Sequence, residues 1–151
     1  MSLFETINND IKAAMLAREK EKLEALRAVK AAFLLAKSEK GAADELSSDT
    51  EIKIVQKLVK QRKEAADIYK ANSRMELHDK EMMEAAFLEI YLPQQLTEED
   101  IVAQLKTIIA QVGATGPQDM GKVMGLATKH FAGKAEGKLV SQKVKEVLAS
   151  L

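Results

Sequence analysis

Residues 48–70, SDTEIKIVQKLVKQRKEAADIYK, carry the clearest structural signal in the chain. The apolar residues of this stretch recur at helical spacings: Ile52, Val55, Leu58, Val59, Ala65, Ala66 and Tyr69. Such spacing places them on one face of a long amphipathic α-helix. Ser48 and Glu51 form an S-x-x-E pattern, which predicts a capping box at the start of that helix.

Toward the N-terminus the same period continues. Ser2 and Glu5 form another S-x-x-E pattern in front of a first amphipathic helix. The charged residues 18–22 either interrupt this helix or form its exposed side, and a further apolar face follows them to about Lys40. Residues 41–50 are mostly small or acidic, and they predict a solvent-exposed loop.

Toward the C-terminus the helices become shorter. A fourth helix is expected to end near Pro93, because the residue before a proline is pushed out of the α region. Thr97 is the expected N-cap of the next helix, and Gly113 is its expected stop. A loop through Gly116 and Pro117 precedes a sixth helix, and a glycine-bounded turn over residues 133–137 separates it from the last one. No segment alternates as a strand does, so the predicted fold class is all-α.

Glycine and proline are unevenly distributed along the chain. Only one of the seven glycines lies in the first 92 residues, and both prolines lie beyond them. This change in helix-breaking residues indicates a domain boundary. We predict a helical domain over residues 1–93 and a smaller helical domain over residues 97–151.

Composition excludes several classes of protein. The 151 residues include 23 basic and 23 acidic ones, so the net charge is zero, which argues against a nucleic-acid binder that uses its whole surface. The absence of cysteine excludes disulfides, thiolate nucleophiles and cysteine-ligated metals. No apolar run is long enough to span a membrane, and the start MSLFETINND does not resemble a secretory signal. We expect a cytoplasmic protein with no membrane partner.

A search for catalytic motifs gives no candidate. The chain has no G-x-S-x-G elbow, no phosphate-binding G-x-x-x-x-G-K-[ST] loop and no G-x-G-x-x-G turn. His78 and His130 are 52 positions apart and lie in different predicted domains, so they form no local ligand pair. We therefore expect no catalytic residue, no metal site and no cofactor in this chain alone.

Positive charge gathers near the C-terminus. Residues 120–151 contain six lysines against two acidic residues. Lys122 and Lys129 are seven positions apart, which places them on nearly one helical face, and Lys138 and Lys145 repeat this spacing. Lys134 lies in the turn between the two helices. Lysines without interleaved aromatic residues suit phosphate contacts better than base stacking, although a charged run is also common on a solvated face.

Two glycines lie inside a predicted helix. Gly121 and Gly125 are four positions apart, and each costs roughly 1 kcal/mol relative to alanine in a helix interior. Close approach of another backbone would explain both. Either a neighbouring helix packs tightly against them or a ligand backbone, such as a nucleic-acid phosphate, approaches them.

Four motifs resemble the YqeY-like proteins: KQRKEA (60–65), YLPQQL (91–96), DMGKVMG (119–125) and GKAEGKLV (133–140). The resemblance covers essentially the whole chain. That family usually has Ala-Asp-Gly where this chain has Ala135-Glu136-Gly137, and the substitution preserves the charge. The resemblance implies an N-terminal domain of long antiparallel helices followed by a small helical domain.

The second half is also similar to the tail domain of GatB, the B subunit of the tRNA-dependent amidotransferases. The shared positions are Gly125, Lys129, Gly133 and Ala135. In that tail domain an asparagine and a proline commonly replace Glu136 and Gly137. The resemblance implies a module that helps to hold the body of a tRNA, and it brings neither the nucleotide site nor the amidase of the full enzyme.

These patterns predict a non-catalytic tRNA-binding or tRNA-enzyme accessory module. Its expected partners are a weakly bound tRNA and an aminoacyl-tRNA synthetase or amidotransferase. Seven residues form the expected RNA-binding site: Lys122, Lys129, Lys134, Lys138, Gly121, Gly125 and Gly133. Two alternatives remain open. One is a component of a glutamine-dependent amidotransferase, a carbon–nitrogen ligase acting on misacylated tRNA, and the other is a helical protein-interaction module that binds no RNA.

Overall fold

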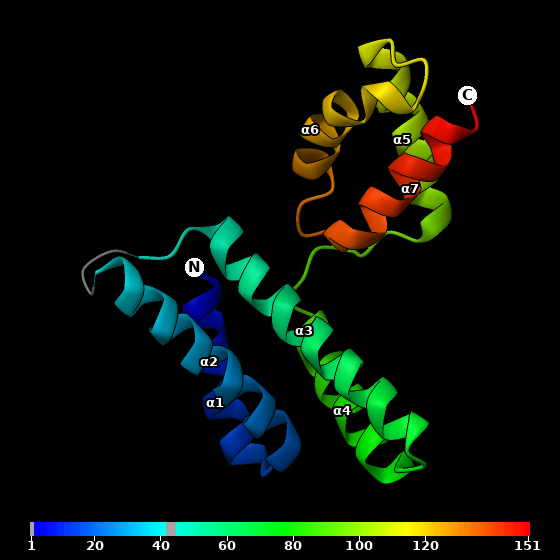
Figure 1. Cartoon of the computed structure of the whole chain (residues 1–151). Helices are drawn as coiled ribbons and strands as arrows, with labels where there is room; N and C mark the ends of the chain where they lie inside the picture. Colours follow the sequence, from blue (N-terminus) through cyan, green and yellow to red (C-terminus); the bar gives the residue numbers. More distant parts are fainter. Residues whose placement is uncertain (1, 42–44) are drawn as a thin grey trace. The chain divides into compact units, whose positions relative to one another are not determined.

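A computed structural model describes residues 2–41 and 45–151 (Figure 1). The described residues form seven α-helices and one short 3-10 helix: α1 (Leu3–Ala17), α2 (Lys20–Lys40), α3 (Ser48–Ala71), α4 (Met75–Glu89), α5 (Glu98–Val112), η1 (Pro117–Asp119), α6 (Met120–His130) and α7 (Gly137–Ala149). No strand occurs within that part of the chain, so the predicted all-α class is confirmed. In the loop expected over residues 41–50, residues 42–44 lie outside the described residues and residues 48–50 belong to α3.

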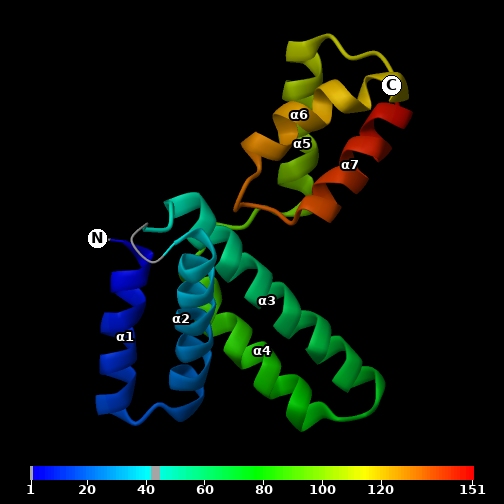
Figure 2. The same cartoon turned by 60° about the vertical axis from the view of Figure 1, so that its left-hand side comes forward.

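The helices gather into two compact units, Met1–Leu92 (unit 1) and Pro93–Leu151 (unit 2). In unit 1, α1 pairs with α2 and α3 pairs with α4, as Figure 2 also shows. The apolar faces of these four helices form one buried core: Ile7, Ile11, Ala14, Ala25, Leu26, Val29, Phe33, Val55, Val59, Ala85 and Leu88. These buried residues recur at helical spacings in α1, α2 and α3, whereas α4 contributes only Ala85 and Leu88 to the core.

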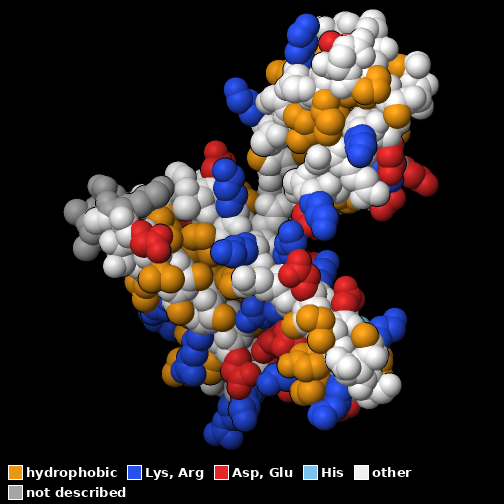
Figure 3. Space-filling view, in the orientation of Figure 1, with side chains coloured by type: hydrophobic (Ala, Val, Ile, Leu, Met, Phe, Trp, Pro, Cys, Tyr) orange, Lys and Arg blue, Asp and Glu red, His pale blue; other side chains and the backbone are white. Residues whose placement is uncertain are grey.

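Some large apolar side chains of unit 1 remain exposed. Leu16 is 87% exposed, Leu35 is 64% exposed and Ile68 is 62% exposed. In Figure 3, hydrophobic side chains gather on the surface over α2 and the start of α3. The helices of unit 1 thus have more apolar surface than their shared core covers.

The two helix starts predicted from S-x-x-E patterns have different outcomes. Ser2 and Glu5 form the expected capping box at the start of α1. The predicted box of Ser48 and Glu51 is wrong, because Ser47 is the N-cap of α3. The Glu51 side chain is instead almost fully buried, and its carboxylate accepts the backbone N–H of Phe4 at 2.8 Å. Glu51 therefore takes part in a tertiary contact and not in the N-terminal cap of α3.

The charged residues 18–22 do interrupt the first helix. Arg18 takes a left-handed conformation, with φ of 58°, and ends α1. Its N–H and that of Glu19 donate to carbonyls of the last turn of α1. Only two residues separate α1 from α2, and the chain reverses direction there (Figure 2).

Ion pairs join α3 to α4. Lys63 Nζ lies 2.5 Å from the Glu89 carboxylate, and Arg62 Nε lies 3.6 Å from the largely buried Glu84. Burial raises the pKa of the Glu84 carboxyl group, although the positive charge of Arg62 opposes this shift. Arg62 and Lys63 both belong to the KQRKEA motif, so this motif contributes contacts within the α3–α4 hairpin.

One hydrogen bond ties the end of unit 1 to its beginning. The hydroxyl of Tyr91, which follows α4, donates to the carboxylate of Asp10 on α1. Burial raises the pKa of the Tyr91 hydroxyl, and the bond to Asp10 raises it further. The helix α4 itself ends at Glu89, four residues before Pro93, as the proline predicts.

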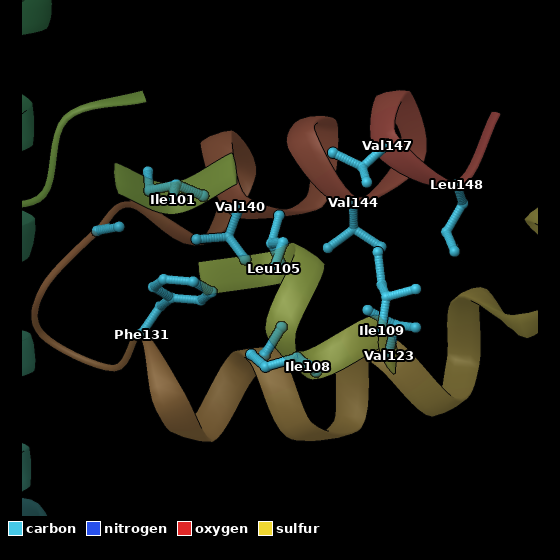
Figure 4. Close-up of a cluster of buried hydrophobic side chains, with 12 residues drawn as sticks. Ile101, Leu105, Ile108, Ile109, Val123, Phe131, Val140, Val144, Val147 and Leu148 are labelled. Atoms are coloured by element: carbon cyan, nitrogen blue, oxygen red, sulfur yellow. The ribbon is translucent and has the colours of Figure 1, made fainter. Parts of the chain in front are cut away.

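Unit 2 consists of α5, α6 and α7 around a second core (Figure 4). The side chains labelled in Figure 4 come from all three helices and point toward one another, and the whole core contains twelve buried residues: Ile101, Leu105, Ile108, Ile109, Val123, Ala127, Phe131, Ala135, Val140, Val144, Val147 and Leu148. Both predicted ends of α5 are confirmed. Thr97 forms a capping box with Asp100, and Gly113 ends the helix with φ of +69°.

None of the helices in the described residues is both long and apolar enough to cross a bilayer.

Candidate nucleic-acid interface

The segment before α6 is held by one carboxylate. Asp119 accepts the backbone N–H of Thr115 at 2.8 Å and lies 3.5 Å from the hydroxyl of the same residue. The backbone hydrogen bond from Thr115 lowers the pKa of Asp119, and the positive charge of Lys122 lowers it further. This contact fixes the turn after Gly116 and sets the direction in which α6 leaves the loop.

Four of the predicted site residues are exposed on α6: Gly121, Lys122, Gly125 and Lys129. Val123 and Ala127 of the same helix are fully buried against the unit 2 core. At 100° per residue, the four exposed positions lie on the side of α6 that faces away from these two. We call this group the α6 face.

The glycines of the α6 face are not explained by packing. A Cβ atom added to Gly121 or to Gly125 would have no other atom within 4 Å outside the local helix backbone. Neither glycine has a positive φ that would require it. Of the two explanations drawn from the sequence, tight packing against a neighbouring helix is therefore excluded within the described residues.

Gly133 has a different reason to be glycine. Its φ is +75°, a left-handed conformation that other residues rarely adopt. The residue is buried, and its carbonyl accepts the side-chain amide of Gln95 at 2.8 Å. The backbone N–H of Leu96 donates to the carbonyl of Lys134 at 2.9 Å. These bonds hold the α6–α7 loop and leave the Lys134 side chain exposed.

The lysines of α7 divide into two kinds. Lys143 is half-buried, and its ammonium group lies 3.2 Å from both Glu98 of α5 and Glu146 of α7. Hydrogen bonds to these two carboxylates raise the pKa of Lys143. Lys138 and Lys145 are exposed on the opposite side of α7. Lys145 was not among the predicted site residues, although its seven-residue spacing from Lys138 is visible in the sequence.

Four lysines of unit 2 constitute what we call the lysine set: Lys122, Lys129, Lys134 and Lys138. All four are exposed, and none forms an ion pair with a residue that the structure describes. Apart from the electrostatic interaction of Lys122 with Asp119, their positive charges are therefore available to an external anion.

The first turns of α6 and α7 differ from those of the other described α-helices. Helices α1 to α5 each carry an acidic residue in the first turn, and α5 carries three. The first turns of α6 and α7 carry none, and they contain Lys122 and Lys138 instead. Because the helix dipole is positive at the N-terminus, a cation there is less favourable than an acid. The nearest acids, Asp119 and Glu136, are the N-cap residues of α6 and α7 and offset part of this effect.

The histidines do not form a site. His130 Nε2 lies 2.6 Å from the Gln104 side chain, and His78 Nδ1 lies 3.0 Å from Asp79 in unit 1. Among the residues that the structure describes, no group of three or more histidine, aspartate or glutamate side chains could hold a metal ion.

Comparison with known proteins places the chain in a family. A family model described as Yqey-like protein matches residues 4–148, which is nearly the whole chain. No curated protein matches the sequence. The matched range includes all four motifs noted in the sequence and every residue of the lysine set. Because the match covers both units, this protein belongs to the YqeY-like protein family.

Proposed function

We propose that unit 2 is a non-catalytic tRNA-binding module that acts beside a tRNA enzyme. The observation that carries this proposal is the reversed charge at the first turns of α6 and α7. Lys122 and Lys138 lie in first turns that carry no acid, whereas the first turns of α1 to α5 each carry at least one. The N-cap acids Asp119 and Glu136 offset part of the unfavourable contact of each lysine with the helix dipole, and a bound phosphate would offset more of it.

The shape of the α6 face suits a sugar–phosphate backbone. Gly121 and Gly125 leave room beside Lys122 and Lys129, since nothing in the described structure fills the space above them. A backbone that approaches the helix closely can be contacted by both lysines at once. Contacts of this kind position a nucleic acid without reading its bases.

The chemistry of the lysine set favours RNA shape over base recognition. Only two aromatic rings lie among the four lysines in the sequence: the fully buried Phe131 and the exposed imidazole of His130, which contacts Gln104. Stacking on bases therefore has little support. The similarity of this region to the tail domain of GatB makes tRNA the RNA class that we propose. The neutral net charge of the chain is consistent with a weak contact that works together with a partner enzyme.

A binding titration with fluorescently labelled tRNA at low salt tests this proposal. The variant carrying Lys122→Ala, Lys129→Ala and Lys134→Ala should bind at least about tenfold more weakly, because three phosphate contacts are lost. The matched control carries Lys12→Ala, Lys20→Ala and Lys53→Ala, which removes three exposed lysines of unit 1. Equal weakening by both variants would indicate that net charge alone matters and would contradict the proposal.

The two alternative functions give different results. A component of a glutamine-dependent amidotransferase would support ATP-dependent amidation of misacylated tRNA when added to an incomplete enzyme, whereas we expect the purified chain to produce none. A module that binds only proteins would retain no tRNA at any salt concentration. Either result would replace the function proposed here.

A further inference from the structure

A groove with a volume of about 260 Å³ lies between α2 and α3 on the surface of unit 1. Its wall on α2 is formed by Ala32, Leu35, Ala36 and Glu39. These positions follow the spacing i, i+3, i+4, i+7, which is the face that a helix presents to a neighbouring helix. All eight described residues that line the groove come from α2 and α3.

The wall on α3 has the same design. It is formed by Ile54, Lys57, Leu58 and Gln61, again at i, i+3, i+4 and i+7. Ile54 and Leu58 are half-buried, whereas Lys57 and Gln61 are exposed. Two helices with aligned apolar stripes therefore frame a channel that suits the side chains of a third helical element.

The groove combines a protruding side chain with small neighbours. Leu35 is 64% exposed at the edge of the groove. Ala32 and Ala36 lie on the same wall, one turn before it and directly after it, and they leave space beside it. Figure 3 shows this part of unit 1 as a hydrophobic area over α2 and the start of α3. The surface thus presents both a protruding leucine side chain and a space that can hold such a side chain.

The two walls of the groove carry opposite charges. Glu39 stands on the α2 wall, and Lys57 stands on the α3 wall. Both side chains are exposed, and neither forms an ion pair with a residue that the structure describes. The groove therefore carries one unpaired acid and one unpaired base on opposite sides.

We infer that this groove is the contact surface between two copies of the chain. A two-fold interface requires a patch that is complementary to itself. Here Leu35 of each copy enters the groove of the other beside the two alanines, and Glu39 of each copy meets Lys57 of the other. A partner of arbitrary sequence need not carry these groups, whereas a second copy brings the same leucine, alanines, acid and base and can match them across a two-fold axis.

The inference concerns unit 1 and is independent of the RNA contact proposed for unit 2. Sedimentation velocity of the full chain, from about 1 µM to about 500 µM, should show the mean mass rising toward twice that of the monomer. Leu35→Asp should keep the protein monomeric across this range. The control Leu16→Asp changes an even more exposed leucine of α1 outside the groove, and it should dimerise as the original protein does.

Charge reversal provides a second test that does not depend on Leu35. Glu39→Lys or Lys57→Glu alone should weaken the dimer by about tenfold, because each places like charges together across the two-fold axis. The double variant Glu39→Lys with Lys57→Glu should restore it. A monomer at every concentration would overturn the inference and leave the groove to a different protein. A dimer that Leu16→Asp disrupts as strongly as Leu35→Asp, or that the double reversal fails to restore, would also overturn it.

Discussion

Lys143 Nζ lies 3.2 Å from Glu98 Oε2, so that α7 is joined to the first turn of α5. The same ammonium group contacts Glu146 on its own helix. This lysine is therefore neutralised inside unit 2, whereas Lys138, five residues earlier, faces solvent without a carboxylate partner among the described residues. Two lysines of one helix thus have separate roles, one in holding the fold and one in the proposed RNA contact.

Replacing each of these two lysines with methionine should separate the roles. Lys143→Met should lower the melting temperature, because two carboxylates lose their partner, and it should reduce tRNA affinity much less than Lys138→Met does. Lys138→Met should leave the melting temperature unchanged or slightly higher, since it removes a cation from the first turn of a helix. Thermal unfolding by circular dichroism and tRNA titration measure the two effects. The same change in both quantities for both variants would contradict this division.

Gly125→Ala should stabilise the protein. A methyl group at this position meets no atom within 4 Å outside the local helix backbone, and alanine is favoured over glycine in a helix by about 0.8–1.0 kcal/mol. Urea unfolding should therefore show a higher free energy of unfolding, and Gly121→Ala should behave in the same way. A loss of stability would show that packing fills the space beside these glycines.

The variant Gly125→Leu tests whether the space beside Gly125 is needed for tRNA binding. Leucine is also a better helix former than glycine, so this variant should remain at least as stable as the original protein. Its side chain would occupy the space proposed for a phosphate backbone, and tRNA affinity should fall. Unchanged affinity would remove Gly125 from the proposed contact.

Asp119 should make the stability of the protein sensitive to acid. The folded-state pKa of Asp119 lies below its ordinary value of 3.8, so the folded protein binds fewer protons here than the unfolded chain. The stabilisation is complete above the ordinary value and is lost as the pH falls through the folded-state pKa. Asp119→Asn should thus lower the melting temperature near neutral pH, and the difference should shrink below pH 3.8. A difference that does not depend on pH would contradict the role given to this carboxylate.

Tyr91→Phe should destabilise unit 1. The substitution removes the hydroxyl donor to Asp10, and a hydrogen bond to a charged group contributes about 1.5–3 kcal/mol. In an Asp10→Ala background the same substitution should have a much smaller effect. Urea unfolding of the four proteins of this double-mutant cycle measures the coupling. Additive effects would show that the two residues act separately.

Much of the helical architecture is predictable from local patterns. The ends of α5 follow from Thr97 and Gly113, because a capping side chain and a left-handed glycine act within one turn of the helix. The end of α4 near Pro93 follows because the residue before a proline is pushed out of the α region. Most core positions follow from helical spacing, although Met15 and Met83 also stand at such spacings and are 53% and 39% exposed.

Contacts between distant residues are what local patterns miss. Two adjacent serines stand at the start of α3, and the S-x-x-E spacing favours Ser48 as the cap because Glu51 stands three positions later. The structure places Glu51 against the backbone of Phe4, which lies 47 positions earlier, so Ser47 caps the helix. Counting charge along the C-terminal segment likewise treats all six lysines alike. The pairing of Lys143 depends on Glu98, which lies on another helix.

The salt dependence of tRNA binding tests the central claim most directly. If the four residues of the lysine set neutralise four phosphates, the logarithm of the binding constant should fall with the logarithm of salt concentration at a slope of about −3 to −4. The triple variant Lys122→Ala, Lys129→Ala, Lys134→Ala should reduce the slope to about −1, because one phosphate contact remains. Absence of tRNA binding at low salt, or the same slope for the variant and the original protein, would contradict the account.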